Sequence, residues 1–249
     1  MQMNHISIPS DHPRAKSLYT RERLVDGFRR GLVVPEGLIA HGRGEAYDYL
    51  LGERTTKTAQ RAIKAAAAIL LLSNRPVISV NGNMAALCPD RVVELAKVAG
   101  ARIEVNIFYR TKEREMAIEA ELELHGAEKL LGVGSKASAR IPELQSERRR
   151  VDPDGIYAAD TVLVPLEDGD RTEALVKMNK TVITIDLNPL SRTSRAANIT
   201  IVDNVVRTMP ALVEATCKLR GTKSLRKIAD DFDNRKNIRE SLKIMKGEV

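Results

Sequence analysis

Three apolar runs rich in β-branched residues are each followed directly by a polar cluster, and this pattern constrains the fold more than any other feature. The runs occupy residues 161–165, 181–185 and 199–202, and the clusters occupy residues 167–173, 186–193 and 203–204. Such short apolar runs are typical of buried parallel strands. In an open α/β sheet, ligands bind beyond the carboxyl ends of the strands. The pattern therefore predicts a polar crevice built from successive strand ends.

Strand and helix patterns alternate along the middle of the chain. Further strands are predicted at 77–80, 102–108 and 130–133, and helices at 89–99, 112–125, 171–178 and 205–219. Alternation of this kind predicts βαβ units, and hence an α/β fold with a mostly parallel sheet flanked by helices. A polar loop region with a short helical turn around Pro142 is expected at 135–159.

The two ends of the chain are predicted to be helical. Helices are expected at 13–30, 45–51 and 58–72, and a charged helix at 224–246, which would pack across the body or against a second copy. We therefore expect an N-terminal helical segment at 1–75, the α/β core at 76–220 and a charged helical tail at 221–249, together forming one compact unit.

Composition excludes several classes of protein. With 249 residues, of which 43% are apolar and 29% charged, the chain can bury a full core. No apolar run approaches the roughly 20 residues that cross a bilayer, and the first residues lack the features of a signal peptide, so we expect a cytoplasmic protein without membrane contact. Cys88 and Cys217 suggest neither a zinc site nor a disulfide, and both are expected to be buried.

The formal charge of +7 favours a small polyanionic ligand over nucleic acid. The chain has three phenylalanines and no tryptophan, and no RNP-like aromatic strand is present. The run Arg148, Arg149 and Arg150 follows Glu147 and is expected to be a solvated face. No nucleic-acid partner is therefore predicted.

Neither common nucleotide motif is present, since the chain has no P-loop and no complete dinucleotide fingerprint. His41, Gly42, Arg43 and Gly44 instead precede a predicted helix. Glycines at a helix start allow backbone N–H groups to approach an anion, and Arg43 would add positive charge. A tight turn with a surface arginine explains the segment equally well.

Two further strand ends carry candidate ligand groups. Asn81 and Asn83 flank Gly82 after the strand at 77–80, where their amides can donate to phosphate or hydroxyl oxygens, although an Asn-Gly turn is common. Arg110 follows the strand at 102–108 and can bind a carboxylate or phosphate, or else begin the next helix as an exposed side chain.

The cluster at 167–173 holds four carboxylates and Arg171. Asp170 is the expected N-cap of the following helix, with Glu173 completing a capping box. The remaining carboxylates could hold Mg²⁺ against a polyphosphate, because this ion prefers oxygen ligands. Asp168 and Asp170 are therefore candidate metal ligands, and both are candidate catalytic residues together with Arg171.

Four stretches of the sequence resemble the archaeal phosphopantothenate synthetase family, also called 4-phosphopantoate–β-alanine ligase. They read GLIAHGRGEA at 37–46, VNGN at 80–83, PLEDGDRTEAL at 165–175 and IDLNPLSRT at 185–193. The resemblance spans residues 9 to 219, and motifs of this length are highly specific. The charged tail after residue 219 is least characteristic.

The resemblance implies an enzyme of coenzyme A biosynthesis that joins 4-phosphopantoate to β-alanine while ATP is converted to AMP and pyrophosphate. It also implies a homodimer on a Rossmann-like core. The family's ATP-binding positions map onto Arg21, Arg43, Asp186, Leu187, Asn188, Arg192, Thr193, Asn204 and Val205. Pattern alone would treat Arg21 as a helix-surface residue.

A mechanism follows as a hypothesis. Arg43, Arg192 and Arg21 would hold the triphosphate, with Mg²⁺ near Asp168 or Asp170. Asn81, Asn83 and Arg110 would bind phosphopantoate, and His41 would either deprotonate the β-alanine ammonium or serve as a phosphate donor or structural group. The alternatives are a nucleotide-binding regulatory protein, a basic nucleic-acid-binding module that uses the +7 charge, and a ligase acting on pantoate without its phosphate.

Overall fold

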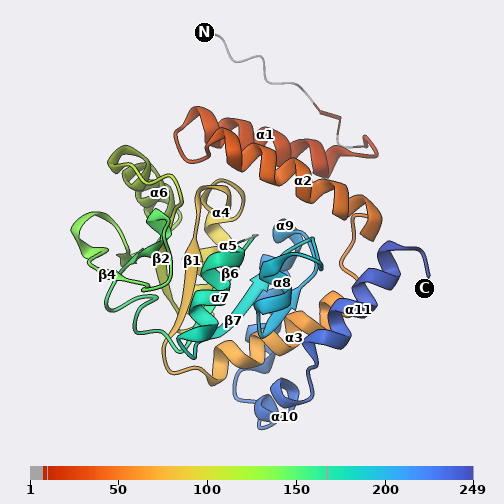
Figure 1. The fold of residues 1–249 in the computed structure, drawn as a ribbon. Coiled ribbons are helices and arrows are strands. Elements are labelled where there is room, and N and C mark those ends of the chain that lie inside the picture. The colour runs from red at the N-terminus through yellow and green to blue at the C-terminus, as the bar shows by residue number, and fades with distance from the viewer. Residues whose placement is uncertain (1–7, 10, 167, 249) are drawn as a thin grey trace.

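Parallel strands form the central sheet of the computed structural model, which describes residues 8–9, 11–166 and 168–248. Within that part of the chain the six-stranded sheet has the order β3-β2-β1-β6-β7-β8, and each neighbouring pair is parallel (Figure 1). The strands are β1 (Pro76–Val80), β2 (Arg102–Val105), β3 (Leu130–Leu131), β6 (Thr161–Pro165), β7 (Thr181–Ile185) and β8 (Ile199–Ile201). This order reverses direction between β1 and β6, as in Rossmann folds, which confirms the predicted α/β class.

Successive strand residues point to opposite sides of the sheet. Because the strands are apolar at successive positions, both faces of the sheet are apolar. Ile78 and Leu163 face one core, which also contains residues of the helices α3 (Lys57–Leu72), α5 (Pro89–Ala99) and α9 (Val205–Leu219). Val77 and Val162 face a second core together with Leu175 of α7 (Gly169–Lys177). Strands buried on both faces explain why the sequence shows continuous apolar runs rather than alternation.

The N-terminal segment forms α1 (Ala15–Arg29), α2 (Pro35–Leu51) and α3, of which α1 and α2 lie over the strand ends (Figure 1). The prediction of a turn at 41–44 was wrong, because α2 runs without interruption from Pro35 to Leu51. Pro35 begins the helix, where its missing N–H costs nothing, and Gly52 ends it in the left-handed conformation at φ 74°. The glycines at 42 and 44 therefore lie inside a helix, and their amides are not available to cradle an anion.

The central helices match their predicted ranges closely. Gly100 ends α5 with φ 66°, and Thr56 and Asn204 cap α3 and α9 with side-chain hydrogen bonds. The other central helices are α4 (Gly82–Leu87), α6 (Lys112–Leu124) and the unpredicted α8 (Arg192–Ala196). The region at 135–159 holds two short 3₁₀ turns, η1 (Gly134–Lys136) and η2 (Glu147–Arg149), and an antiparallel ribbon of β4 (Ala139–Arg140) and β5 (Arg150–Val151).

The C-terminal tail packs on the body of this chain. It forms α10 (Leu225–Asp230) and α11 (Asn234–Met245), because the predicted single helix is broken where Asp233 caps α11. Asn234 and Asn237 of α11 hydrogen-bond the backbone and side chain of Thr200 in the edge strand β8. The tail thus covers a sheet edge that would otherwise expose unpaired backbone groups.

The structure also shows whether the two cysteines are buried and whether a helix could span a membrane. Cys88 is buried as expected, but Cys217 is exposed, because it lies on the outer side of α9. Within the described ranges, no helix is both long and apolar enough to cross a membrane.

Candidate active site

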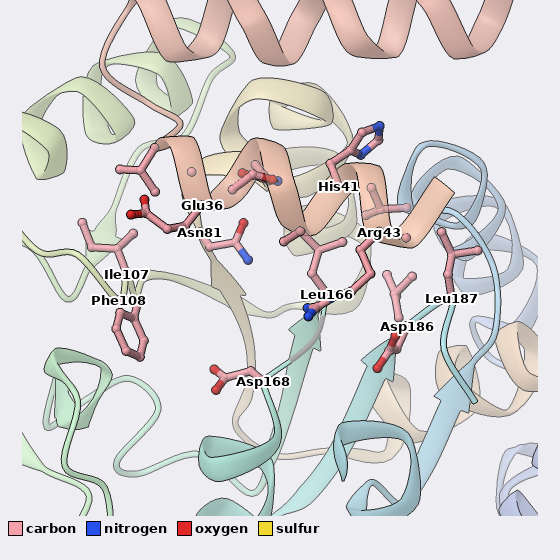
Figure 2. A pocket seen from close by; sticks show the side chains of 18 of the residues that line it. Glu36, His41, Arg43, Asn81, Ile107, Phe108, Leu166, Asp168, Asp186 and Leu187 are labelled. Atoms are coloured by element: carbon pink, nitrogen blue, oxygen red, sulfur yellow. The ribbon is translucent and has the colours of Figure 1, made fainter. Parts of the chain in front are cut away.

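A cleft of about 360 Å³ lies at the carboxyl ends of β1, β6, β7 and β8, where α2 forms its roof (Figure 2). Its position coincides with the reversal in strand order between β1 and β6, which is where open α/β sheets bind ligands. Ten of the predicted site residues line it, namely His41, Arg43, Asn81, Asn83, Asp168, Asp186, Leu187, Asn188, Asn204 and Val205. The convergence expected from the strand-end pattern is therefore present in the structure.

The end of β7 forms one half of the cleft. Asp186 accepts a hydrogen bond from the backbone N–H of Asn188 at 2.9 Å and another from the Ser191 hydroxyl at 2.5 Å. These contacts fix a tight loop that presents Leu187 and Asn188 to the cleft. Arg43 reaches the same space from above, because its side chain extends from α2 toward Leu166 (Figure 2).

An ion-pair network holds α2 over this half of the cleft. Arg207 of α9 pairs with Asp48 of α2 at 2.5 Å and with Asp203, after β8, at 2.6 Å. Asn204 donates to the same Asp48 carboxylate at 2.9 Å, and Thr55 donates to Asp203 at 2.6 Å. Burial raises the pKa of Asp203 above its ordinary value, although Arg207 opposes the shift. Because Asp48 and Asp203 are buried, breaking one partner would leave an uncompensated charge.

Asp168, after β6, binds two arginines at the centre of the cleft floor. Arg171 lies beneath it with its Nε 2.5 Å from the carboxylate, and Arg148 pairs with the same oxygen from the cleft side. Burial acts to raise the pKa of Asp168, but the two guanidinium groups outweigh burial and lower it below its ordinary value. The carboxylate is therefore ionised at neutral pH.

Asp168 occupies the N-cap position of α7, which was predicted for Asp170. Its side chain makes no capping hydrogen bond because it binds the arginines instead. The predicted capping box of Asp170 and Glu173 is therefore wrong. Glu167, from the same predicted cluster, lies outside the described residues.

Asn81 and Asn83 position the start of α4 against the roof. Asn81 caps α4 by accepting the Met84 N–H at 3.0 Å, and Asn83 donates to the Gly37 carbonyl of α2 at 2.9 Å. Glycine is needed between them, since a Cβ on Gly82 would lie 2.0 Å from the Leu32 carbonyl oxygen. Both amides thus have structural bonds while they line the cleft.

Six predicted residues do not line the cleft. Arg21 pairs with Glu45 at 2.8 Å between α1 and α2, and Arg110 is buried against Glu115 and the Gly132 carbonyl. Arg192 is exposed and pairs with Asp170 at 2.6 Å and with Glu173 at 2.7 Å. Thr193 is buried, and its hydroxyl accepts the Asp168 N–H at 2.7 Å. Arg171, at 1% exposure, lies wholly below the floor.

Comparison with known proteins identifies the family. A family model described as phosphopantothenate/pantothenate synthetase matches residues 58–248. The chain belongs to this family. A protein of Thermococcus kodakarensis named 4-phosphopantoate–β-alanine ligase is 52% identical over 240 residues, which is 95% of this chain and 91% of the relative. Relatives of the same name are 52% identical in Methanosarcina mazei, over 94% of this chain and 92% of that protein, and 54% identical in Methanospirillum hungatei JF-1, over 81% and 82%.

Membership of the synthetase family confirms the resemblance drawn from four sequence stretches.

His41 is the histidine that lines the cleft. Its Nε2 atom is buried and has no hydrogen-bond partner among the described residues. Burial lowers the pKa of His41 below its ordinary value, which outweighs the opposing effect of Glu45, so the ring is neutral and able to accept a proton. Figure 2 shows the ring on the side of α2 that points away from Asp168.

The carboxylates predicted to hold Mg²⁺ are not brought together. Asp168 lines the cleft with one oxygen bound by two arginines, whereas Asp170 lies outside it beside Arg192. Among the described residues, no group of three or more His, Cys, Asp or Glu side chains could hold a metal ion. The predicted donor set therefore does not form a preassembled metal site.

Two arginines that the sequence analysis did not select line the cleft, namely Arg114 and Arg148. The prediction of a solvated face at 148–150 was wrong for Arg148, whose side chain is 14% exposed. No local signal distinguishes it from its neighbours, since the three arginines are consecutive. Arg114 lies in the first turn of α6, directly after the strand-end segment that contains Arg110.

Proposed function

We propose that this protein condenses 4-phosphopantoate with β-alanine and converts ATP to AMP and pyrophosphate. One observation carries the proposal: a polar cleft at the strand-order reversal, in a chain that matches proteins named 4-phosphopantoate–β-alanine ligase over 95% of its length. Both substrates besides β-alanine are strongly anionic, so the protein's main task is to neutralise charge and align the reacting groups.

ATP would occupy the half of the cleft formed by β7 and β8. Asp186, Leu187 and Asn188 line this half on one side, and Asn204 and Val205 on the other. Amide and carboxylate groups of this kind suit the ribose and base. Arg43 would bind the triphosphate, because it extends into the centre of the cleft.

Arg21, Arg192 and Thr193 remain predicted ATP ligands by resemblance. Arg192 lies beside α7, and its contact with phosphate would require its pairs with Asp170 and Glu173 to open. Thr193 would act through the Asp168 N–H that it binds. Arg21 would act across α2 through Glu45.

The reaction would proceed in two displacements. A carboxylate oxygen of 4-phosphopantoate attacks the α-phosphorus of ATP, the bond to the bridging oxygen breaks, and pyrophosphate leaves with that electron pair. The β-alanine amine then attacks the carbonyl carbon of the acyl-adenylate, and AMP leaves. The amine loses a proton in this second step. The neutral imidazole of His41 is the proposed acceptor, supported by its unpartnered Nε2, and its ring would have to turn toward the cleft floor to reach the amine.

Magnesium would enter with the nucleotide. This ion usually keeps several waters and binds substrate phosphates with one or two carboxylates, which agrees with the single predicted ligand, Asp168, at the cleft. Asp170 is a proposed ligand or catalytic group only if it turns from Arg192. The catalytic role predicted for Arg171 would be exerted through Asp168, since Arg171 does not line the cleft.

A homodimer is the proposed assembly. Its support is a set of large apolar side chains exposed on the neighbouring helices α1 and α2, namely Tyr19, Phe28, Ile39, Tyr49 and Leu50. Large apolar side chains that are exposed on neighbouring helices can form a surface for protein–protein contact. Light scattering coupled to gel filtration would measure the mass, and a monomer at micromolar concentration would contradict the dimer. A cytoplasmic location also remains a prediction.

The test of the proposed function is the substrate dependence of AMP release. Purified protein with ATP should release AMP and pyrophosphate in equal amounts and form an amide, with 4-phosphopantoate and β-alanine both present. A nucleotide-binding regulatory protein would bind ATP without this turnover. Efficient turnover of pantoate in place of 4-phosphopantoate would favour a ligase that acts on pantoate without its phosphate.

A further inference from the structure

We propose that Arg114 and Arg148 together bind the phosphate group of the acid substrate, at the end of the cleft opposite the nucleotide. The inference rests on the proposed function and names a subsite within it. It assigns the phosphate to two residues that differ from Arg110, the arginine expected from the sequence. Arg110 is buried against Glu115 and does not line the cleft.

Arg148 is held rigidly on the cleft wall. Asp168 pairs with one of its terminal nitrogens, and its guanidinium carbon lies 6.0 Å from the centre of the Phe108 ring. Its Nε is buried and has no hydrogen-bond partner among the described residues. A planar guanidinium fixed in this way retains donors that can bind two oxygens of one phosphate.

Arg114 is held by backbone carbonyls rather than by a carboxylate. Its Nε donates to the Leu32 carbonyl at 3.0 Å, and one terminal nitrogen donates to the Tyr109 carbonyl at 2.8 Å. Carbonyl acceptors orient the group without cancelling its charge. Arg114 therefore adds a positive charge to the cleft and forms no ion pair with any residue that the structure describes.

The two arginines also influence each other. Burial, followed by the nearby charge of Arg148, lowers the pKa of Arg114 to about 10, while Glu36 opposes the shift. Among the described residues, Glu36 acts on Arg114 and Asp168 acts on Arg148, while Arg171 adds a third positive charge beside Asp168, so these five side chains carry one more positive than negative charge. A phosphate between the arginines would supply the missing negative charge in a partly desolvated site.

The strand order gives the subsite its direction. Arg114 lies in the first turn of α6 after β2, and the Arg148 carbonyl accepts a hydrogen bond from Asn106 just after β2, so both come from the β2 side of the sheet. Asp186 and Asn204 follow β7 and β8, with β1 and β6 lying between the two groups. A substrate with its phosphate on the arginines would point its carboxylate toward the middle of the cleft, where the α-phosphorus of ATP must lie for attack.

The experiment compares Arg114→Ala, Arg148→Ala and the milder Arg114→Lys and Arg148→Lys with a matched control. Arg150→Ala removes an arginine from the same segment, but its side chain pairs with Glu147 at 3.5 Å and does not line the cleft. For each protein, KM for 4-phosphopantoate and KM for ATP are measured, after circular dichroism confirms folding. Inhibition by inorganic phosphate is measured against both substrates.

Each alanine variant should raise KM for 4-phosphopantoate by roughly 10- to 100-fold, the range for a lost charge-assisted hydrogen bond. KM for ATP should change less than about threefold. The lysine variants should raise KM for 4-phosphopantoate by an intermediate factor, since lysine keeps the positive charge but lacks the paired N–H donors of the guanidinium. Phosphate should compete with 4-phosphopantoate in the wild type and in Arg150→Ala, and weakly in the alanine variants.

Unchanged KM for 4-phosphopantoate in both alanine variants would overturn the inference, as would an equal rise in KM for ATP. Either result would leave the proposed function intact, because wild-type turnover would still depend on 4-phosphopantoate. Absence of that turnover in the wild type would instead overturn the proposed function itself.

Discussion

The Nε of Arg171 lies 2.5 Å from the carboxylate of Asp168 beneath the cleft floor. Arg171 also donates to the Ser79 hydroxyl at 2.8 Å and to the Asn106 side-chain oxygen at 2.6 Å, so it joins the ends of β1, β2 and β6. Burial lowers the pKa of Arg171 to about 10, despite the opposing charge of Asp168. The guanidinium remains charged at neutral pH, and Asp168 is its nearest compensating charge.

Asp168→Asn should destabilise the protein by about 3–5 kcal/mol, because it leaves the buried Arg171 charge without a full counter-charge. Urea denaturation followed by circular dichroism would measure the loss. Asp170→Asn is the matched control, since Asp170 lies two residues away and its pair with Arg192 is exposed. If the urea midpoint of Asp168→Asn stayed at the wild-type value, as that of the control should, the structural role of Asp168 would be contradicted.

The stabilisation from Asp168 should depend on pH with a definite sign. The folded-state pKa of this acid is lowered by Arg171 and Arg148, against the effect of burial. The stabilisation is therefore present above the unfolded pKa of about 3.9 and is lost as pH falls through the lower folded value. The gap in unfolding free energy between the wild type and Asp168→Asn should narrow below pH 4. A difference in unfolding free energy that stays constant with pH would contradict this role of the Asp168 carboxylate.

Glu104 of β2 should show the opposite dependence. Burial raises its pKa from 4.5 to about 7, although the N–H groups of Asp152 and Ile156 donate to it. Its contribution to stability is therefore full below pH 4.5 and is lost as pH rises through about 7. Compared with Glu104→Gln, the wild type should lose up to about 3 kcal/mol of relative stability over this range. Parallel stability curves would show that the carboxyl does not titrate in this way.

Gly42→Ala and Gly37→Ala, both on α2, should have opposite effects. A Cβ on Gly42 meets nothing within 4 Å, so alanine should stabilise the helix by roughly 0.5–1 kcal/mol. A Cβ on Gly37 would lie 2.5 Å from the Asn83 side-chain oxygen, and overpacking there should cost about 1–3 kcal/mol. Thermal unfolding measures both. A marked rise in KM for ATP in Gly42→Ala would support an anion-binding turn in place of the helix.

Arg43→Ala should raise KM for ATP by roughly 10- to 100-fold, as expected for a lost charge-assisted contact. KM for 4-phosphopantoate should change much less, because Arg114 and Arg148 line the other end of the cleft. Arg54→Ala serves as the control, since Arg54 is exposed just beyond α2 and does not line the cleft. Equal effects of the two substitutions would show that Arg43 acts only through general charge.

The sequence predicts the strand ends well because their signal is local. Short β-rich runs mark β6, β7 and β8, and the polar residues that follow them must emerge at one edge of a parallel sheet. Asp186, Asn188 and Asn204 meet in the cleft for this reason. The prediction needed only strand type and direction.

The missed features depend on contacts between distant segments. Arg148 enters the cleft because Asp168 binds it, and Glu104 fixes the following loop through the Asp152 and Ile156 amides. Glycines at 42 and 44 suggested a turn, yet α2 continues through them because its Asp48 is bound by Arg207 of α9. Periodicity within a segment carries no information on such partners.

The most direct measurement of the central claim follows heavy oxygen from the carboxylate of 4-phosphopantoate. Attack of that carboxylate on the α-phosphorus, followed by amide formation, transfers one labelled oxygen to AMP. Mass spectrometry of the products should therefore find one heavy oxygen in each AMP and one in the new amide. AMP without label, or label in inorganic phosphate, would contradict an AMP-forming ligation in this cleft.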